Sequence, residues 1–374
     1  MSDLSCTFSR ASMAKALDRL AALLPARTTL PALSCVRVSH VDGGMALRLE
    51  ATDLSRHGDT SVALAEQCEP FAAFCLPLKR LLSVAKEYPG VLATLKGDKD
   101  SAVFSAGGSR IKLPSMPGTE FPLMDFAGVE WTPAGEGGAG SLRAALSLVS
   151  HAIGTEIAKP AMIGVSLGNN GKGMLAVALD GPRLAKEFVS GWEATAGPAT
   201  IPTEGVRALL NFFPVDTRLS LQASEGRMRF SDEDGGTLTV STLDSPYPNY
   251  EQVIPRDCDI VARVSREALL SALRRVRLAF GGDDTLKRAA FTFGVEGILI
   301  HAETTEGVAD DAVPADVDGR EIRIGFSTTY MAELLSSLSA ETVTVELKQP
   351  ERATVWREEG SAGLRLLMPL RLLY

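Results

Sequence analysis

The first helix of the chain can be predicted from the spacing of its apolar residues. Between residues 12 and 24, apolar side chains recur every three or four positions, at Met13, Leu17, Leu20, Ala21 and Leu24. The opposite face carries Lys15, Asp18, Arg19 and Ala22. This period predicts an amphipathic helix over residues 12–24 that ends at Pro25. A short strand over residues 5–9 is predicted to precede it.

Strand patterns follow this helix. Residues 35–40 and 45–51 form two strand-like runs joined by Asp42-Gly43-Gly44, a sequence typical of a hairpin turn. Thr52-Asp53 and a further strand over residues 60–64 come next. Pro77 precedes a second predicted helix over residues 78–87, and two more hairpins lead to Phe121-Pro122.

The same order of elements occurs twice more. In the second stretch, helices are predicted over residues 141–152 and 204–213, and strands over residues 164–167, 174–178, 219–222, 227–231 and 237–241. Asp180 follows a strand there as Asp53 does, and Tyr247-Pro248 closes the stretch as Phe121-Pro122 does. In the third stretch, helices are predicted over residues 266–280 and 327–338, and strands over residues 260–264, 290–293, 299–303, 342–347 and 354–357. The chain therefore looks like three copies of one unit.

A last apolar strand is predicted over residues 364–374, and Pro369 interrupts it. Because proline offers no N–H to a neighbouring strand, this strand must lie at a sheet edge or end at Pro369. Met368 and Leu370 would then line a surface instead of filling a sheet, which suggests a groove.

Two helices and about eight strands in each copy predict an α+β fold, with helices on one side of antiparallel sheets. The chain has 374 residues, of which 45% are hydrophobic and 22% charged, values typical of a soluble globular protein. No apolar run approaches the roughly 20 residues that cross a membrane, and the N-terminus lacks the features of a signal peptide, so we expect a cytoplasmic protein. The five cysteines form no Cys-x-x-Cys pair and are expected to be free buried thiols.

The sequence carries no recognised catalytic or metal-binding constellation, and no cofactor is expected. The four histidines are scattered singly. Gly137-Gly138-Ala139-Gly140 resembles a phosphate-binding loop only weakly, because no predicted strand precedes it. Asp53 and Asp180 stand where a catalytic acid could stand, but their repetition at equivalent points favours a structural role, that of a carboxylate capping a turn. The net charge of −8 argues against a simple nucleic-acid binder.

Several motifs carry a family resemblance. They are Thr29-Leu30-Pro31-Ala32-Leu33, Ala51-Thr52-Asp53-Leu54, Phe121-Pro122, Leu179-Asp180-Gly181-Pro182-Arg183-Leu184, Tyr247-Pro248-Asn249-Tyr250 and Met368-Pro369-Leu370-Arg371-Leu372. Together, in this order, they resemble the bacterial DNA polymerase III beta subunit, the beta sliding clamp. Each motif alone is weak, but the set spans the whole chain.

The resemblance implies three DNA-clamp domains, here expected over residues 1–128, 129–256 and 257–374. It also implies a homodimeric ring of six similar domains around duplex DNA, without catalysis. DNA polymerase III alpha subunit, other polymerases and the clamp loader would dock by short peptides on a pocket between the second and third domains.

Three sets of residues follow from this resemblance. The positions that match the partner-peptide pocket are Met162, Leu179, Gly181, Pro182, Arg183, Leu184, Pro248, Val253, Tyr330, Leu366, Leu367, Met368, Pro369, Leu370 and Arg371. The basic residues expected to face the DNA channel are Lys15, Arg19, Arg27, Arg266, Arg274 and Arg275. The subunit interface is expected at Ile111, Leu113, Leu278 and Phe280. The alternatives are plain core packing for the apolar residues and a solvated helix face for the basic ones.

Some positions depart from the family's pattern. Pro182 stands where histidine is common, Gln252 where a basic residue is frequent, and residues 155–161 lack the aromatic and arginine side chains of the family's channel loop. Leu373-Tyr374 extends beyond the usual end and could partly cover the groove. A specialised or accessory clamp, a clamp-like protein that no longer encircles DNA, and an enzyme or carbohydrate-binding module on a repeated α+β scaffold therefore remain alternatives.

Overall fold

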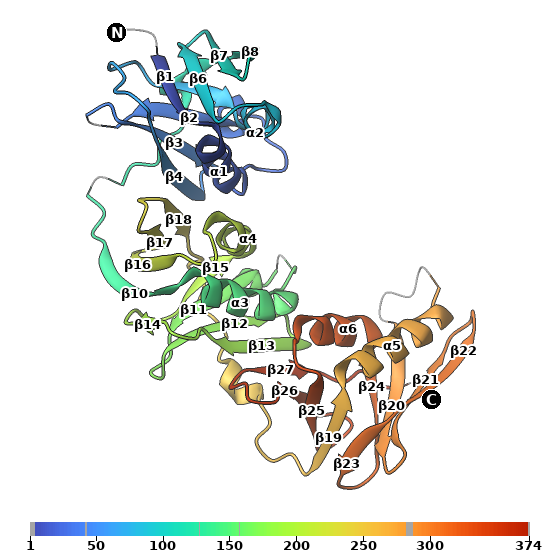
Figure 1. Ribbon diagram of the computed structural model, residues 1–374. Helices are drawn as coiled ribbons and strands as arrows, with labels where there is room; N and C mark the ends of the chain where they lie inside the picture. Colours follow the sequence, from blue (N-terminus) through green and yellow to red (C-terminus); the bar gives the residue numbers. More distant parts are fainter. Residues whose placement is uncertain (1–3, 42, 127, 157, 282–286, 373–374) are drawn as a thin grey trace. The chain divides into compact units, whose positions relative to one another are not determined.

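The computed structural model describes residues 4–372 except residues 42, 127, 157 and 282–286. The chain forms two compact units, and its elements can be followed in Figure 1. Unit 1 comprises Met1–Arg143, Gly191–Ala196 and Glu204–Thr242. Unit 2 comprises Ala144–Ser190, Gly197–Thr203 and Leu243–Tyr374. Helices combined with antiparallel sheets confirm the predicted α+β class.

The helices lie where the apolar period predicts them, with shifted ends. They are α1 (Arg10–Ala21), α2 (Leu78–Glu87), α3 (Ala139–Val149), α4 (Thr203–Phe212), α5 (Arg266–Val276) and α6 (Thr328–Ser337). Helix α1 begins two residues before the predicted start because the Ser9 side chain accepts the backbone N–H of Ser12 and caps the helix. Ser265 and Ser327 cap α5 and α6 in the same way.

Unit 1 contains two antiparallel sheets. The first has four strands in the order β1 (Leu4–Ser9), β6 (Leu92–Gly97), β7 (Ser101–Ala106), β8 (Ser109–Pro114). The second has ten strands in the order β14 (Glu193–Ala194), β10 (Thr132–Gly138), β16 (Arg218–Ser224), β17 (Arg227–Asp232), β18 (Thr237–Ser241), β4 (Arg56–Ala63), β3 (Ala46–Thr52), β2 (Cys35–His40), β5 (Phe74–Pro77), β9 (Met116–Pro117).

Unit 2 also contains two antiparallel sheets. One has nine strands in the order β15 (Ala199–Pro202), β11 (Gly164–Asn169), β12 (Met174–Leu179), β13 (Arg183–Phe188), β27 (Leu364–Leu367), β26 (Thr354–Glu358), β25 (Thr342–Leu347), β19 (Ile260–Ser265), β23 (Ala315–Asp318). The other has four strands in the order β22 (Val308–Val313), β21 (Gly297–Glu303), β20 (Arg288–Gly294), β24 (Ile322–Ser327).

Each unit contains one strand pair that joins two of the repeated stretches. In unit 1, β4 of the first stretch pairs antiparallel with β18 of the second, with His57 opposite Thr239. In unit 2, β13 of the second stretch pairs antiparallel with β27 of the third, with Leu184 opposite Leu366. We call these two pairs the internal joints. In each joint, two strands that would otherwise be sheet edges pair with each other, so the sheet continues from one stretch into the next.

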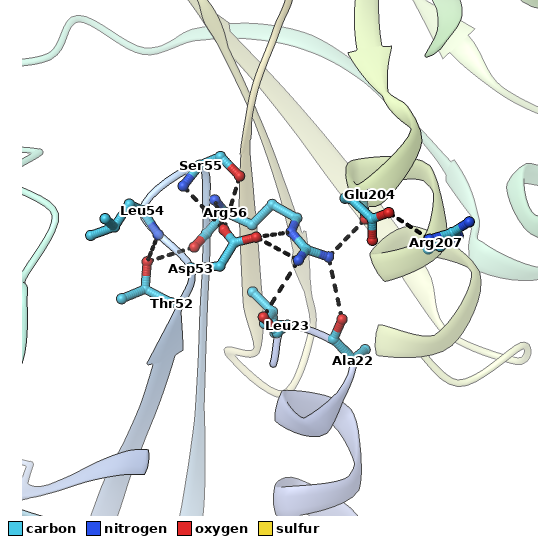
Figure 2. A network of polar contacts seen from close by, with 9 residues as sticks. All are labelled: Ala22, Leu23, Thr52, Asp53, Leu54, Ser55, Arg56, Glu204 and Arg207. Atoms are coloured by element: carbon cyan, nitrogen blue, oxygen red, sulfur yellow. Dashed lines mark hydrogen bonds and ion pairs between the residues drawn. The ribbon is translucent and has the colours of Figure 1, made fainter. Parts of the chain in front are cut away.

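A buried arginine reinforces the first internal joint, as Figure 2 shows. In the turn before β4, Asp53 accepts the backbone N–H of Ser55 at 3.0 Å and that of Arg56 at 2.7 Å, and its second oxygen accepts Arg56 Nε at 2.8 Å. The Arg56 guanidinium also donates to the backbone oxygens of Ala22 at 3.3 Å, just beyond α1, and of Glu204 at 2.8 Å, in α4. The predicted structural role of Asp53 is therefore confirmed.

The second internal joint repeats this turn. Asp180 accepts the backbone N–H of Arg183 at 2.9 Å and the Nε of the same arginine at 2.8 Å. Arg183 also forms an ion pair with Glu333 on α6 and lies 4.3 Å from the centre of the Tyr330 ring. The predicted turn-capping role of Asp180 is confirmed as well.

The terminal strand is shorter than the predicted run. β27 ends at Leu367, before Pro369, and it has β13 and β26 as neighbours, so it is not an edge strand. After the proline the chain contacts the four-stranded sheet of unit 2, where the Leu370 N–H donates to the oxygen of Gly325 in β24 at 2.7 Å. The sequence predicted either an edge strand or a strand that ends at Pro369, and the structure shows the second.

Two further properties concern the whole described chain. All five cysteines are free thiols, and four of them are buried. No helix among the described residues is both long and apolar enough to span a membrane.

The Asp53–Arg56 pair generates a prediction on stability. Burial alone would raise the Asp53 pKa, but the hydrogen bonds and charge of Arg56 outweigh it, so the pKa is lowered from its ordinary value. The pair therefore stabilises the fold above the unfolded carboxyl pKa of about 4, and this contribution is lost as the pH falls through the folded pKa. Asp53→Asn should lower the stability of unit 1 by about 3 kcal/mol at pH 7 and by less at pH 3.

Urea unfolding followed by circular dichroism at both pH values measures this effect. Asp234→Asn removes an exposed carboxylate from the same unit and is the matched control, for which little change is expected. An Asp53→Asn loss that is equally large at pH 3 would show that the ion pair is not its source.

Candidate functional site

An apolar cluster lies at the second internal joint in unit 2. Its buried members come from four neighbouring strands and the segment that leads into one of them, and they are Leu179, Leu184, Ala353, Val355, Leu364 and Leu366. Half-buried side chains pack around them, namely Met162, Tyr247, Tyr250 and Ile254. The cluster forms because Leu184 and Leu366 face each other across the joint, and Leu179 is the partner of Leu184 on the other side.

The C-terminal segment borders this cluster. The Met368 N–H donates to the Pro182 oxygen at 2.8 Å, and the Leu370 N–H donates to the Gly325 oxygen. These two bonds hold the segment on either side of Pro369, which cannot donate. Met368 keeps 36% of its surface exposed, which is unusual for a methionine beside an apolar cluster.

A groove of about 720 Å³ opens beside Met368. We call it the Met368 groove, and its walls are Asn249, Glu251, Gln252, Val253, Ile254, Pro255, Arg256, Asp257, Glu351, Arg352, Ala353 and Met368. Val253 is 54% exposed, so the groove presents the apolar side chains of Val253 and Met368 to the solvent. Exposed apolar side chains rimmed by charged ones are typical of a protein-binding surface.

Two smaller hollows flank the C-terminal segment. One, beside the turn at Pro182, is lined by Gly154, Thr155, Glu156, Lys159, Met162, Asp180, Gly181, Pro182 and Tyr330. The other is lined by Arg323, Gly325, Pro350, Glu351, Pro369, Leu370, Arg371 and Leu372. The structure therefore surrounds the predicted Met368, Pro369 and Leu370 with concave surface.

Polar contacts fix the rim of the apolar cluster. The Tyr247 hydroxyl donates to the Val177 oxygen at 3.1 Å, and burial raises the pKa of this hydroxyl well above its ordinary value. The Lys186 ammonium lies 5.7 Å from the centre of the Tyr250 ring and 2.5 Å from Glu251. The rim is therefore held in place, while Met368 keeps the conformational freedom of an unbranched side chain.

Three predicted pocket residues, Leu367, Arg183 and Pro248, belong neither to the apolar cluster nor to the lining of the groove and the two hollows. Leu367 is fully buried in the main core of unit 2, because its side chain points to the helix-covered face of the sheet. Arg183 is also buried, and its guanidinium forms ion pairs with the carboxylates of Asp180 and Glu333. Sequence reasoning missed Tyr247, Tyr250, Ile254 and Val355, although the aromatic pair next to Pro248 was a visible signal.

The predicted DNA-channel residues divide into those that are exposed or half-buried and one that is buried. Lys15, Arg27, Arg274 and Arg275 are exposed, and Arg266 is half-buried with its Nε on the Ala340 oxygen at 3.1 Å. Arg274 pairs with Glu267 at 3.2 Å and Arg275 with Asp311 at 2.6 Å.

Arg19 is the exception, and the prediction that it lies on the solvent face of its helix is wrong. It is buried, forms an ion pair with Asp232, donates from Nε to the Phe212 oxygen at 3.0 Å and lies over the Phe212 and Phe213 rings. The helical period alone could not reveal Asp232, which lies far away in the sequence.

The predicted interface residues also differ in how exposed their side chains are. Leu278 is 86% exposed, the highest value among them, while Phe280 and Ile111 are half-buried. Leu113 is 1% exposed because it packs into the core of its own sheet, so it is unsuited to a subunit contact through its side chain. The predicted cover over the groove by Leu373-Tyr374 lies outside the described residues.

Among the described residues, no group of three or more His, Cys, Asp or Glu side chains could hold a metal ion. The site offers an apolar surface, a flexible thioether and charged rims instead. Such a surface binds the side chains of another molecule.

Known proteins resemble this chain along its whole length. A family model of the N-terminal domain of the DNA polymerase III beta subunit matches residues 4–125, and one of its C-terminal domain matches residues 251–371. The beta sliding clamp of Synechococcus elongatus is 28% identical over 365 residues, which cover 95% of this chain and 96% of that protein. The Escherichia coli beta sliding clamp is 24% identical and covers 98% of this chain.

Solved structures share the fold. The crystal structure of a DNA polymerase sliding clamp from Pseudomonas aeruginosa superposes with a TM-score of 0.89 at 23% identity and covers 98% of this chain and 100% of its own. The DNA polymerase III beta subunit from Thermotoga maritima gives a TM-score of 0.88 at 19% identity, with 98% of this chain covered. Since the family models of both ends of one subunit match in order, the chain belongs to the DNA polymerase III beta subunit family, the beta sliding clamps.

Proposed function

We propose that two copies of this chain form a closed ring around duplex DNA and tether replication proteins to it. The observation that carries this proposal is the pair of internal joints. The first stretch joins the second through β4 and β18, and the second joins the third through β13 and β27. A third joint of the same kind would need β22 of the third stretch and β8 of the first.

Both of these strands are sheet edges. β8 ends the order β1-β6-β7-β8, and β22 begins the order β22-β21-β20-β24 among the described residues. A free edge exposes unpaired N–H and C=O groups. A second copy of the chain, related by a twofold axis, can cover both edges, because each β8 meets the β22 of the other copy. Ile111, Leu278 and Phe280 would lie at this contact, with Leu113 supporting it from the core.

The repetition also supports three clamp domains over residues 1–128, 129–256 and 257–374. In this proposal the helices line the channel, and Lys15, Arg27, Arg266, Arg274 and Arg275 face the phosphates. Exposed Lys79, Arg80 and Arg143, on α2 and α3, extend this set beyond the residues predicted from sequence. A ring is retained by its topology, so modest basicity inside an acidic protein is sufficient.

Partner proteins are proposed to bind at the Met368 groove and the hollow at Pro182. The contacting residues would be Met162, Leu179, Gly181, Pro182, Leu184, Pro248, Val253, Tyr330, Leu366, Met368, Pro369, Leu370 and Arg371. The class of partner is a short peptide of the alpha subunit, another polymerase or the clamp loader. Such a protein acts where bacterial DNA is replicated, in the cytoplasm, and needs no catalytic group of its own.

Pro182 favours altered partner preference as a second candidate. It lies in the hollow with Lys159, Met162 and Tyr330, where the family commonly offers a histidine side chain. The proline side chain has no hydrogen-bond donor, so this position contributes shape to the hollow and no donor to a partner. An accessory clamp with its own set of partners is consistent with this change.

The groove gives a prediction on partner binding. Met368→Asp should lower the affinity for a fluorescent peptide of the pattern Gln-Leu-x-Leu-Phe at least about tenfold, because a carboxylate would be buried against apolar anchors. Fluorescence anisotropy measures the affinity. Val295→Asp adds the same charge at a 97% exposed position of the same unit and is the control. Unchanged binding to a folded Met368→Asp protein would place the partner site elsewhere.

The ring gives a prediction on DNA retention. After loading by the clamp loader, the protein should stay on nicked circular DNA and be lost within minutes once the circle is cut, because a ring slides off an end. Gel filtration of labelled protein before and after cutting measures this. Leu278→Asp with Phe280→Asp should abolish retention by breaking the dimer, since burying each apolar side chain contributes about 1.5–3 kcal/mol. Equal retention on cut and closed DNA would contradict encirclement.

A further inference from the structure

We infer that the segment between Phe121 and β10 forms a strap over His57 at the first internal joint, which is closed while this histidine is neutral and opens when it is protonated. The strap comprises residues 122–126 and 128–131 of the described chain. The device lies within unit 1 of a single chain, so it does not depend on the proposed ring. Three features support it, namely the anchoring of the strap, the surroundings of His57 and the difference between the two internal joints.

Two aromatic residues anchor the strap. The Phe126 ring meets the His57 ring edge to face, with 5.5 Å between the ring centres. The guanidinium carbon of Arg229, in β17, lies 3.8 Å from the centre of the Trp131 ring and 4.9 Å from that of Phe126. Arg227, in the same strand, lies 5.5 Å from the centre of the Phe126 ring. Each such contact is weak by itself, so the strap is held by a small set of stacked rings and cations that can separate together.

His57 packs against this strap and is almost entirely buried. Only 3% of its surface is exposed, and its Nδ1 atom has no hydrogen-bond partner among the described residues. Its Nε2 atom lies 3.8 Å from a Glu50 oxygen, which is too far for a hydrogen bond. Its neighbour across the joint is the uncharged Thr239. Burial of this kind favours the neutral imidazole, because a charged ring would lose its hydration without gaining a hydrogen bond.

Charged groups from β3, β4 and β17 surround His57. They are the carboxylates of Glu50 and Asp59 and the guanidiniums of Arg48 and Arg229. Arg48 forms ion pairs with both carboxylates, and Arg37 pairs with Glu50 as well. The strap itself adds Asp125, which directly precedes Phe126. Both carboxylates closest in influence to His57 therefore already have arginine partners, so a proton on the imidazole would add a cation that they do not compensate fully.

These surroundings set the direction of the coupling. Burial lowers the pKa of His57, Glu50 and Asp59 raise it, Arg48 and Arg229 lower it, and the net pKa lies below its ordinary value. When the strap opens, water reaches the imidazole and the pKa returns toward the ordinary value of about 6.5. Closure of the strap is therefore fully favoured above about pH 6.5 and weakens as the pH falls from there toward the lowered pKa of the closed form.

The second internal joint has an apolar residue at the position of His57. The turns before β4 and β13 match, because Asp53 and Asp180 each donate their N–H to the oxygen of an arginine three residues further on, at 3.2 and 3.1 Å. His57 and Leu184 directly follow these arginines and are therefore equivalent. A leucine needs no hydrogen bond when it is buried. A histidine at this position instead provides a group that titrates close to neutral pH.

Opening of the strap would change the surface of the first joint only. It would free the rings of Phe126 and Trp131 and admit water to the polar residues around His57. In unit 2, burial and then the charges of Arg365 and Arg183 lower the pKa of His151 to about 3, so this histidine stays neutral in mild acid. Mild acid would therefore act on His57 and leave His151 unchanged.

Because coupling is reciprocal, removing the strap contact should change the titration of His57. Phe126→Ala should raise the His57 pKa toward 6.5, since the imidazole would then be hydrated. Deuterium exchange at the C2 carbon of each imidazole, followed by mass spectrometry of peptides from the full-length chain, measures the pKa of each histidine separately. Leu123→Ala changes a 55% exposed residue of the same strap and is the matched control, for which no shift is expected. An unchanged His57 pKa in the Phe126→Ala protein would overturn the coupling.

Amide hydrogen exchange of the strap tests the opposite direction. After correction for the intrinsic exchange rate, its protection should fall several-fold, at most about tenfold, from pH 7.5 to 5.5, because opening takes up one proton. The fall should be absent in His57→Gln, which cannot titrate, and kept in His40→Gln, which removes another histidine of the same sheet. An equal fall in His57→Gln, or none in the original protein, would overturn the proposal. The titration of Phe126→Ala keeps His57 in place, so it decides the matter even if His57→Gln does not fold.

Discussion

The structure depends on one interaction, the pairing of edge strands that joins one repeated stretch to the next. An edge strand that is not paired carries free N–H and C=O groups. The pairs β4–β18 and β13–β27 remove four such edges by joining consecutive stretches. In the described chain β8 and β22 remain sheet edges, as do β1 and β24 at the other ends of the same two four-stranded sheets. A chain with two complementary ends is suited to assembly with its own copies.

The internal joints share a backbone arrangement but differ in the chemistry of their outer face. At the second joint the facing residues are Leu184 and Leu366, and the apolar cluster grows around them. At the first joint the equivalent residues are His57 and Thr239, and Phe126 packs 5.5 Å from the His57 ring. One joint is therefore polar and covered, whereas the other is apolar and open beside Met368. This difference explains how a repeated fold leaves an open apolar surface at only one of its two internal joints.

Much of this organisation could be predicted from sequence, because it is local. Helix periods, the Asp turns and the proline that ends the terminal strand all act within a few residues. Long-range contacts could not be predicted in the same way. Arg19 has the spacing of a surface residue, and only the approach of Asp232 and Phe212 buries it. Leu113 lies in an alternating strand and Leu367 in an apolar run, and the pairing of the sheets decides that they face the core. β10 was missed because its sequence, Thr-Pro-Ala-Gly-Glu-Gly-Gly, has almost no strand propensity and is held by β16.

Family membership explains some features of this chain, and its own residues add others. The fold and the clamp identity follow from similarity along the whole chain. The chain's own residues place Pro182 in the hollow that flanks the C-terminal segment. Electron microscopy of the purified full-length protein tests the central claim most directly. We expect closed rings with a central hole and a mass of twice 39.7 kDa, whereas single open arcs at all concentrations would contradict the account.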